Sequence, residues 1–317
     1  MPNPLNKLIA PRFPSAAIGF ESGNVSIVQL ERRRAVFALK RAATVTLSEA
    51  LLKPSFDESN IADGNELANI LTELAASAGL LKQRRWSVAL PEAATRTVIL
   101  GLESAVSSRR ELDEVLSWKT ERSLGVPLEE LRVERERLPP DAQGRPRYIV
   151  TAVRAGVLLE YENVFASLGW RAGLILPRHM GEEQWLLQNG SQGDSLLVSS
   201  YADGFTAVLV RRNQPLIVRS VLCETEDRDD ELYRLLLFYR DRSVSADDHL
   251  ATSSLALERL LVVGEGFGKE HVSELVNQTL DIHVRALNAE EVGLALPTGE
   301  LNFDAIAAPA GLATLAW

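Results

Sequence analysis

The chain has very little cysteine and histidine, and it lacks the clusters in which these residues do chemistry. Among 317 residues there are one cysteine and four histidines, namely Cys223, His179, His249, His271 and His283. One cysteine cannot close a disulfide within the chain, and the histidines are scattered with no i,i+4 pair. No GxSxG motif is present either. We therefore expect no metal site and no catalytic nucleophile built from these residues.

Long hydrophobic runs and an excess of basic charge are also missing. The longest apolar candidate, 232–239, is interrupted by Arg234 and is far shorter than the roughly 20 residues that span a bilayer. The first residues contain no apolar stretch typical of a signal peptide. A net charge of −9 disfavours nucleic acid as a partner. We expect a cytoplasmic protein with no transmembrane segment of its own.

What is present is enough apolar sequence for more than one core. Hydrophobic residues make up 46% of the chain and charged residues 24%, which is typical of a globular protein. Because single cores rarely grow beyond roughly 250–300 residues, the length predicts at least two domains. The same succession, a strand meander followed by helices, occurs twice. We predict a first domain over 1–190, a second over 191–290, and a C-terminal segment 291–317 that returns to the first domain.

The first half contains a meander and then a smaller unit. Residues 17–46 read as three strands with a tight turn at Gly23-Asn24, where positive φ is needed. Asp63 and Glu66 form a capping box ahead of an amphipathic helix. A strand, helix, strand, strand, helix succession then predicts a small inserted α+β subdomain over 86–168.

The second half repeats the meander after a polar stretch, 189–194, that we interpret as a linker. The pattern predicts strands over 195–222, 259–264 and 281–287, helices over 229–242, 247–257 and 269–279, and a last helix that starts after Pro309. Trp118 and Trp185 each interrupt a polar helix surface, and we expect both to pack in the core.

Three turns could bring backbone N–H groups close to a phosphate chain. Each joins an apolar strand to small residues, which allow close approach. The candidate nucleotide-binding residues are Glu21, Ser22, Gly23, Asn24, Ser26, Asp203, Gly204, Thr206, Gly264 and Gly266. Taken singly, each turn is better explained as an ordinary hairpin or strand end. Their order along the two halves is what favours a nucleotide cleft.

This order of segments resembles the actin, sugar-kinase and Hsp70 ATPase superfamily. Within it, the chain is most similar to the PilM family of type IV pilus assembly proteins, which are relatives of FtsA. The likeness rests on IGFESGNVSIVQL (18–30), on SVALPEAATRTVILGL (87–102) and on AAPAGLATLAW (307–317), and it extends over nearly the whole chain. It implies an α/β, actin-like (ribonuclease-H-like) fold of two domains with a small α+β insertion subdomain, and ATP with Mg²⁺ as the cofactor.

The chain departs from that family at each of the three loops. An Asp of the first loop is replaced by Glu21, and the Asp-x-Gly of the second loop corresponds to Ser200 and Ala202. Glu265 separates the two glycines of the third loop. Phosphoryl transfer depends on positioning and on the charge of the metal, so these changes predict a weakened or lost nucleotide site and no catalytic residues.

The resemblance implies a scaffold of a type IV pilus or a related secretion machine. Such a scaffold binds the cytoplasmic N-terminal peptide of a PilN-like inner-membrane protein, beside the subdomain predicted at 86–168, and is held at the membrane by that partner. The pilus motor ATPase and a second copy of the chain are further candidate partners. Two alternatives remain open. One is an active ATPase or small-molecule kinase relying on Glu21 and Asp203, and the other is an FtsA-like filament former.

Overall fold

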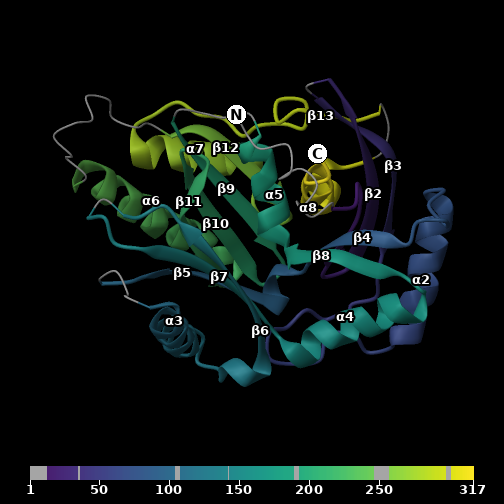
Figure 1. Ribbon diagram of the computed structural model, residues 1–317. Helices are drawn as coiled ribbons and strands as arrows, with labels where there is room; N and C mark the ends of the chain where they lie inside the picture. Colours follow the sequence, from purple (N-terminus) through teal and green to yellow (C-terminus); the bar gives the residue numbers. More distant parts are fainter. Residues whose placement is uncertain are drawn as a thin grey trace.

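Two sheets face each other across a pair of helices, and a third, smaller sheet lies below them (Figure 1). The computed structural model describes residues 13–34, 36–103, 108–141, 143–188, 193–245, 257–297 and 301–317. In these ranges no helix is long and apolar enough to cross a membrane.

The first half is built on a six-stranded sheet in the order β13-β3-β2-β1-β4-β8. The meander β1–β2–β3 is antiparallel, and β4 continues the sheet in parallel with β1. The predicted Asp63 cap is confirmed, because its carboxylate accepts from the backbone N–H groups of Asn65 and Glu66. The elements are β1 (Ala16–Glu21), β2 (Asn24–Arg33), β3 (Val36–Thr46), α2 (Gly64–Ser77), β4 (Arg85–Leu90), α4 (Ala155–Ser167), β8 (Arg171–Pro177) and β13 (Leu294–Ala295).

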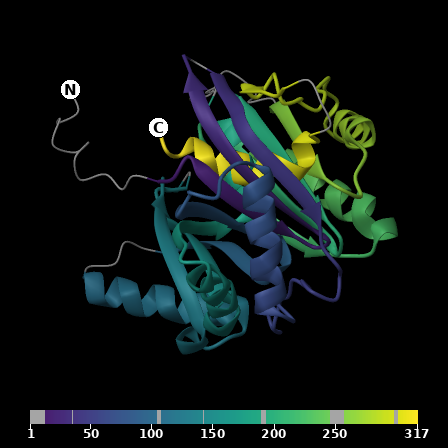
Figure 2. The same ribbon diagram turned by 90° about the vertical axis from the view of Figure 1, so that its right-hand side faces the viewer.

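The third sheet belongs to an insertion that is narrower than the predicted 86–168. It has the order β5-β7-β6 and is covered by α3 (Figures 1 and 2). At the ends of the predicted range, β4 joins the first-half sheet, and α4 buries Tyr161 and Phe165 in the first-half core, because both elements have apolar faces that fit there. The insertion comprises η1 (Glu92–Ala94), β5 (Thr95–Gly101), α3 (Arg109–Leu124), η2 (Leu128–Glu130), β6 (Leu131–Leu138) and β7 (Arg147–Arg154).

The second half is a four-stranded sheet in the order β11-β10-β9-β12, with α6 and α7 packed on one side. Its inner strands β9 and β10 are buried almost throughout, as expected for strands covered on both faces. The elements are β9 (Asp194–Tyr201), β10 (Gly204–Arg211), β11 (Gln214–Leu222), η3 (Thr225–Asp227), α6 (Arg228–Ser245), β12 (Leu257–Gly264) and α7 (Lys269–Leu280).

The predicted strand 281–287 is wrong. Only Ala286 pairs with β12, through a single bridge to Leu260. The Asn277 side chain bonds both the N–H and the C=O of Val284, so this backbone is satisfied without a strand partner. The predicted helix 247–257 lies almost entirely outside the described residues, as do positions 189–192 of the predicted linker.

Two helices join the halves: α5 (Arg178–Leu187) and α8 (Phe303–Thr314) lie between the large sheets and contact each other closely (Figure 1). A Cβ atom at Gly311 would stand 1.8 Å from the carbonyl oxygen of Gly181, so the crossing requires glycine. Trp185 is fully buried here, as predicted, and its indole N–H donates to the Ala307 carbonyl at 2.8 Å.

Helix α8 begins before Pro309, at Phe303, so the prediction that it starts after the proline is wrong. Asn302 caps it by accepting from the Asp304 N–H at 3.0 Å. The proline ring packs against β1, where a Cβ atom at Gly19 would stand 2.8 Å from it. Burial of this face compensates for the backbone bond that proline removes.

Candidate functional site

Two hairpins of the same design meet at a cleft between the halves. Glu21 pairs with Asn24 across the first two-residue turn, and Tyr201 pairs with Gly204 across the second. The hairpin register therefore places Tyr201, and not Ser200, at the position equivalent to Glu21. Neither Tyr201 nor Ser200 offers a carboxylate.

A cavity of about 310 Å³ lies between these hairpins and the start of α8. Six of the ten sequence-predicted nucleotide-binding residues line it: Glu21, Ser22, Asn24, Ser26, Gly264 and Gly266. These residues come from β1 and the turn after it, from β2, and from the end of β12 and the residues that follow it, so the topology brings the first and third loops together.

The other four candidates do not line this cavity. Gly23 occupies the first turn with φ of 78°, and Asp203 is exposed at the tip of the second turn. Gly204 packs its backbone against Val221, where a Cβ atom would stand 1.9 Å from the Val221 oxygen. Thr206 is fully buried below the cleft and donates to Glu92 at 2.9 Å.

The second loop holds an arginine that sequence reasoning missed. Arg228, the first residue of α6, is 3% exposed, and its guanidinium donates to the carbonyls of Tyr201 at 2.8 Å and Ala202 at 2.7 Å. It also donates to Ser200 Oγ at 3.0 Å and lies 3.5 Å from the Glu265 oxygen. The only sequence signal was a cation at the start of an acidic helix, where the helix dipole disfavours it.

A second arginine lies at the floor of the cleft. Arg178, at the start of α5, is ion-paired with Glu21 of the first hairpin, and its Nε donates to Glu182 at 2.5 Å. A Cβ atom at Gly264 would stand 2.8 Å from its Nη2, so the guanidinium also rests against the second half. We call Glu21, Arg178, Glu182 and Arg228 the cleft cluster.

The cleft cluster does not fit a magnesium ion. Magnesium prefers oxygen ligands, with one or two carboxylates beside its waters. The carboxylate of Glu21, which lines the cavity, is already engaged by Arg178. At the second loop the Ser200 hydroxyl bonds the Glu265 carbonyl and accepts from Arg228. Two guanidinium groups, those of Arg178 and Arg228, line the cavity beside these groups.

A second polar cluster, the central cluster, joins η1 and α5 to β10 and β11. Its members are Glu92, His179, Glu183, Thr206 and Ser220, of which all but Ser220 are buried. The Glu92 carboxylate lies 2.8 Å from His179 Nδ1 and accepts from Thr206 at 2.9 Å. Burial opposes its charge, but the attraction of His179 and the hydrogen bonds outweigh this and lower the pKa of Glu92. Burial likewise opposes the charge of His179, but the carboxylate of Glu92 raises its pKa overall.

Glu183 of the central cluster has no hydrogen bond to Oε1 and is 5% exposed. Burial raises its pKa to about 7, with a small further contribution from Glu136 of β6 and an opposing one from His179. A carboxyl group that titrates near neutral pH is common at functional sites. This one lies at the junction of the halves and not in the cavity.

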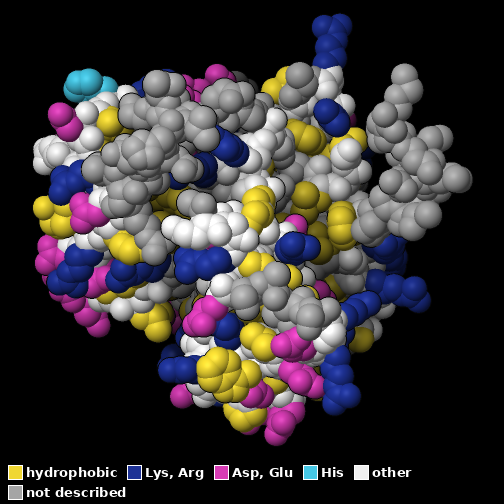
Figure 3. Space-filling model, turned by 60° about the vertical axis from the view of Figure 1, so that its left-hand side comes forward, with side chains coloured by type: hydrophobic (Ala, Val, Ile, Leu, Met, Phe, Trp, Pro, Cys, Tyr) yellow, Lys and Arg dark blue, Asp and Glu magenta, His cyan; other side chains and the backbone are white. Residues whose placement is uncertain are grey.

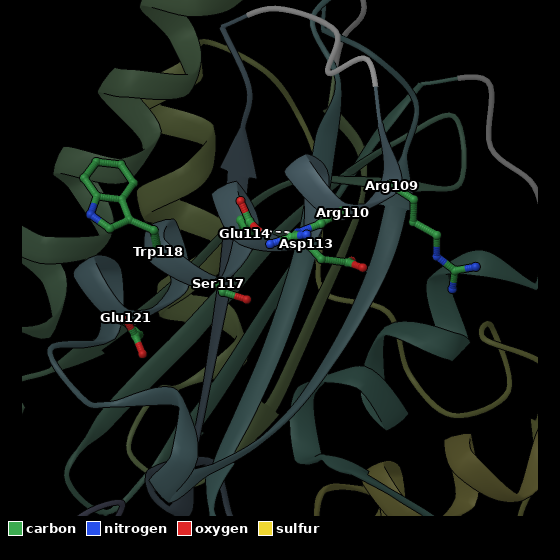
Figure 4. A pocket seen from close by; sticks show the side chains of 7 residues that line it. All are labelled: Arg109, Arg110, Asp113, Glu114, Ser117, Trp118 and Glu121. Atoms are coloured by element: carbon green, nitrogen blue, oxygen red, sulfur yellow. Dashed lines mark hydrogen bonds and ion pairs between the residues drawn. The ribbon is translucent and has the colours of Figure 1, made fainter.

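A larger hollow, of about 740 Å³, lies elsewhere and is not an enclosed site. Its seven lining residues all come from α3 (Figure 4): Arg109, Arg110, Asp113, Glu114, Ser117, Trp118 and Glu121. Trp118 is 55% exposed, so the prediction that it packs in the core is wrong. Acidic, basic and apolar side chains are interspersed over the face in Figure 3, without a large patch of one sign.

Comparisons with known proteins identify the fold. No family model matches the sequence, and no curated protein is detectably similar to it. The chain is similar to a solved structure of a PilM–PilN type IV pilus biogenesis complex, with 18% identity, 96% of this chain and 99% of that one covered, and a TM-score of 0.72. The predicted actin-like fold is therefore confirmed over nearly the whole chain.

Other solved structures are more distant. The ethanolamine utilization protein EutJ from Carboxydothermus hydrogenoformans has 11% identity, 96% of this chain and 92% of that one covered, and a TM-score of 0.48. The cytoplasmic domain of EpsL, an inner-membrane component of the type II secretion system of Vibrio cholerae, has 12% identity, 95% and 93% covered, and a TM-score of 0.47.

Proposed function

We propose that this chain is an actin-like scaffold of a type IV pilus or related secretion machine. It binds the cytoplasmic N-terminal peptide of a PilN-like inner-membrane protein and is held at the membrane by that partner. Supporting this is the similarity to the PilM–PilN complex, which extends across 99% of the matched chain and includes the inserted subdomain. The pilus motor ATPase and a second copy of the chain are further partners under this proposal.

The observation that carries the scaffold role, as opposed to an enzymatic one, is the state of the cleft carboxylates. Glu21 is paired with Arg178, and Asp304 is paired with Lys269 at 2.8 Å. Asp203 is exposed at the turn and does not line the cavity. An ATPase or kinase of this fold needs free acids to orient a metal and a water, and these residues do not supply them. We therefore propose that nucleotide binding is weakened or lost.

The peptide interaction is tested by calorimetric titration. The ligand is a synthetic peptide of the cytoplasmic N-terminus of a single-span membrane protein encoded beside this gene, and the control is the same composition in scrambled order. We expect saturable binding of the native peptide only. Equal binding of both peptides, or of neither, would contradict the scaffold proposal.

The enzymatic alternative is tested in the same preparation. We expect no heat from ATP with Mg²⁺ and no phosphate release above background. Mg²⁺-dependent turnover that disappears in Glu21→Ala would establish the ATPase alternative instead. Filaments that form as the protein concentration rises would point to the FtsA-like alternative.

A further inference from the structure

Two guanidinium groups, those of Arg178 and Arg228, line the cleft of this protein. In a two-part protein, a ligand closes a cleft when it contacts both parts better in the closed state than in the open one. Both guanidinium groups of the cleft cluster are covalently part of the chain, so their effective concentration at the cleft is fixed by the fold.

Arg228 joins the second hairpin to the third loop by hydrogen bonds. Without it, these two segments would be connected only through the sheet. Its Nη2 donates to Tyr201 and Ala202 of the second hairpin, and its Nη1 reaches Ser200 and the oxygen of Glu265, which follows β12. A planar guanidinium with five N–H donors suits such a set of acceptors, whereas a lysine ammonium does not.

Hydrophobic packing alone does not explain why Arg228 is buried. In the described ranges no carboxylate lies within ion-pair distance of its buried guanidinium, and its Nε has no hydrogen bond. It also begins α6, where the helix dipole opposes a cation. Carbonyl oxygens of the second hairpin and of the β12–α7 turn therefore stabilise its charge.

Gly266 is matched to this arginine. A Cβ atom there would stand 1.8 Å from Arg228 Nη1, and the residue has φ of 96°. The absence of a side chain at Gly266 thus leaves space for a guanidinium. The resemblance described above would assign this space to a nucleoside.

Arg178 connects this arrangement to the first half. It pairs with Glu21 at the end of β1 and lies against Gly264 at the end of β12. Its Nε donates to the carboxylate of Glu182, which lies one turn further along α5. Loss of Glu21 would leave Arg178 with Glu182 as its carboxylate partner and would remove its connection to the first hairpin.

We propose that Arg228 and Arg178 act as built-in ligands of the cleft, which closes without a nucleotide. Arg228 ties the second hairpin to the third loop within the second half and so orders that wall of the cleft. Arg178 connects the first hairpin to the third loop, through its pair with Glu21 and its position against Gly264. The closed arrangement of the halves is then a constant property of the chain and does not depend on cellular nucleotide.

Chemical rescue tests the role of Arg228. Arg228→Ala removes the guanidinium and leaves a space of its shape, so we expect the thermal midpoint to fall by about 5–10 °C. Guanidinium chloride, far below its denaturing range, should restore at least half of the loss, whereas equal NaCl should not. The matched control is Arg234→Ala on the same helix, whose partner Glu231 is also near Arg219. It should lose little and gain nothing from guanidinium. A folded Arg228→Ala variant with no rescue would overturn the proposal for Arg228.

A milder variant tests the connection between halves even when Arg228→Ala does not fold. Glu21→Gln keeps the size of the side chain and removes the charge that holds Arg178. By hydrogen exchange and mass spectrometry, we expect about tenfold faster exchange both in residues 19–26 and in residues 262–268, which lie in opposite halves. Faster exchange confined to 19–26 would overturn the proposed tie.

The last test uses the protein without any substitution. A cleft closed by its own cations should show no change in thermal midpoint with Mg²⁺ and ATP at millimolar concentration. A clear stabilisation would overturn the proposal. No peptide takes part in any of these measurements, so their failure leaves the proposed peptide binding untouched, and a failed peptide titration leaves the proposal for the two arginines untouched. Stabilisation by ATP would also count against the proposed loss of nucleotide binding.

Discussion

The cleft cluster and the central cluster join the same two halves with different chemistry. At the cleft, the positive charges are arginines, which stay protonated at any physiological pH. In the centre, the partners are His179, Glu92 and Glu183, which all titrate. Burial raises the pKa of Glu183 to about 7, and the attraction between Glu92 and His179 raises the pKa of His179 and lowers that of Glu92. The cleft cluster therefore keeps the same charge at any physiological pH, while the stability contributed by the central cluster depends on pH.

The largest expected effect is at the central cluster. Glu92→Ala leaves His179 and Thr206 without their shared acceptor, and we expect a loss of about 3–5 kcal/mol, as for a broken buried ion pair. Chemical denaturation measures this loss. Glu129→Ala, an exposed carboxylate outside both clusters, should change stability by less than about 0.5 kcal/mol. Equal effects of the two substitutions would remove the distinction between buried and surface carboxylates.

The pH dependence separates the two clusters directly. The folded pKa of Glu183 is raised to about 7 from 4.5, so its contribution to stability is complete below 4.5 and is lost as pH rises through 7. His179 acts in the same direction, because its raised folded pKa gives stability below 6.5 that is lost as pH rises through the folded value. Glu92, with its lowered pKa, gives stability above 4.5 that is lost as pH falls through its folded value.

Glu183→Gln should therefore flatten the thermal midpoint between pH 5 and pH 8. The variant should gain on the order of 3 kcal/mol over the unchanged protein at pH 8 and nothing at pH 4.5, since one pKa unit is worth about 1.4 kcal/mol. Thermal melts across this range measure the gain. Parallel curves for the two proteins would show that Glu183 does not titrate near neutrality.

Both clusters rely on α5, whose position depends on its crossing with α8. Gly311→Ala places a Cβ atom 1.8 Å from the Gly181 oxygen, and we expect a loss of about 2 kcal/mol from overpacking. Gly156→Ala in α4 is the control, because no atom lies within 4 Å of its Cβ position and alanine favours a helix by about 0.5–1 kcal/mol. Stabilisation by both substitutions would mean that the helices can separate without cost.

The smallest effect is expected at the rim of the cleft. Asp304→Asn breaks the pair with Lys269, whose side chain is 33% exposed, so we expect a loss below about 1 kcal/mol that shrinks further in high salt. Denaturation at low and high salt measures it. A loss as large as that of Glu92→Ala would show that the rim contributes to the junction as much as the centre does.

Local pattern was enough to predict most elements of this fold. The Asp63 cap defines the start of α2, because a side-chain oxygen and three residues of spacing suffice for it. The segment 281–287 forms no strand, which local pattern could not predict, since Asn277 satisfies its backbone. The start of α8 could not be predicted either, since it depends on the packing of Pro309 on β1. Trp118 was misplaced because one exposed aromatic residue looks the same in sequence as a buried one.

By itself the sequence determined the two glycine-containing turns, the third loop and their order, because turn chemistry depends on neighbouring residues. Only the tertiary structure decided what faces those loops. Arg178 and Arg228 reach the cleft from the starts of two helices, 157 and 207 positions beyond Glu21 by subtraction of their numbers (178 − 21 and 228 − 21). No local pattern connects residues so far apart, since their meeting depends on how the sheets and helices pack.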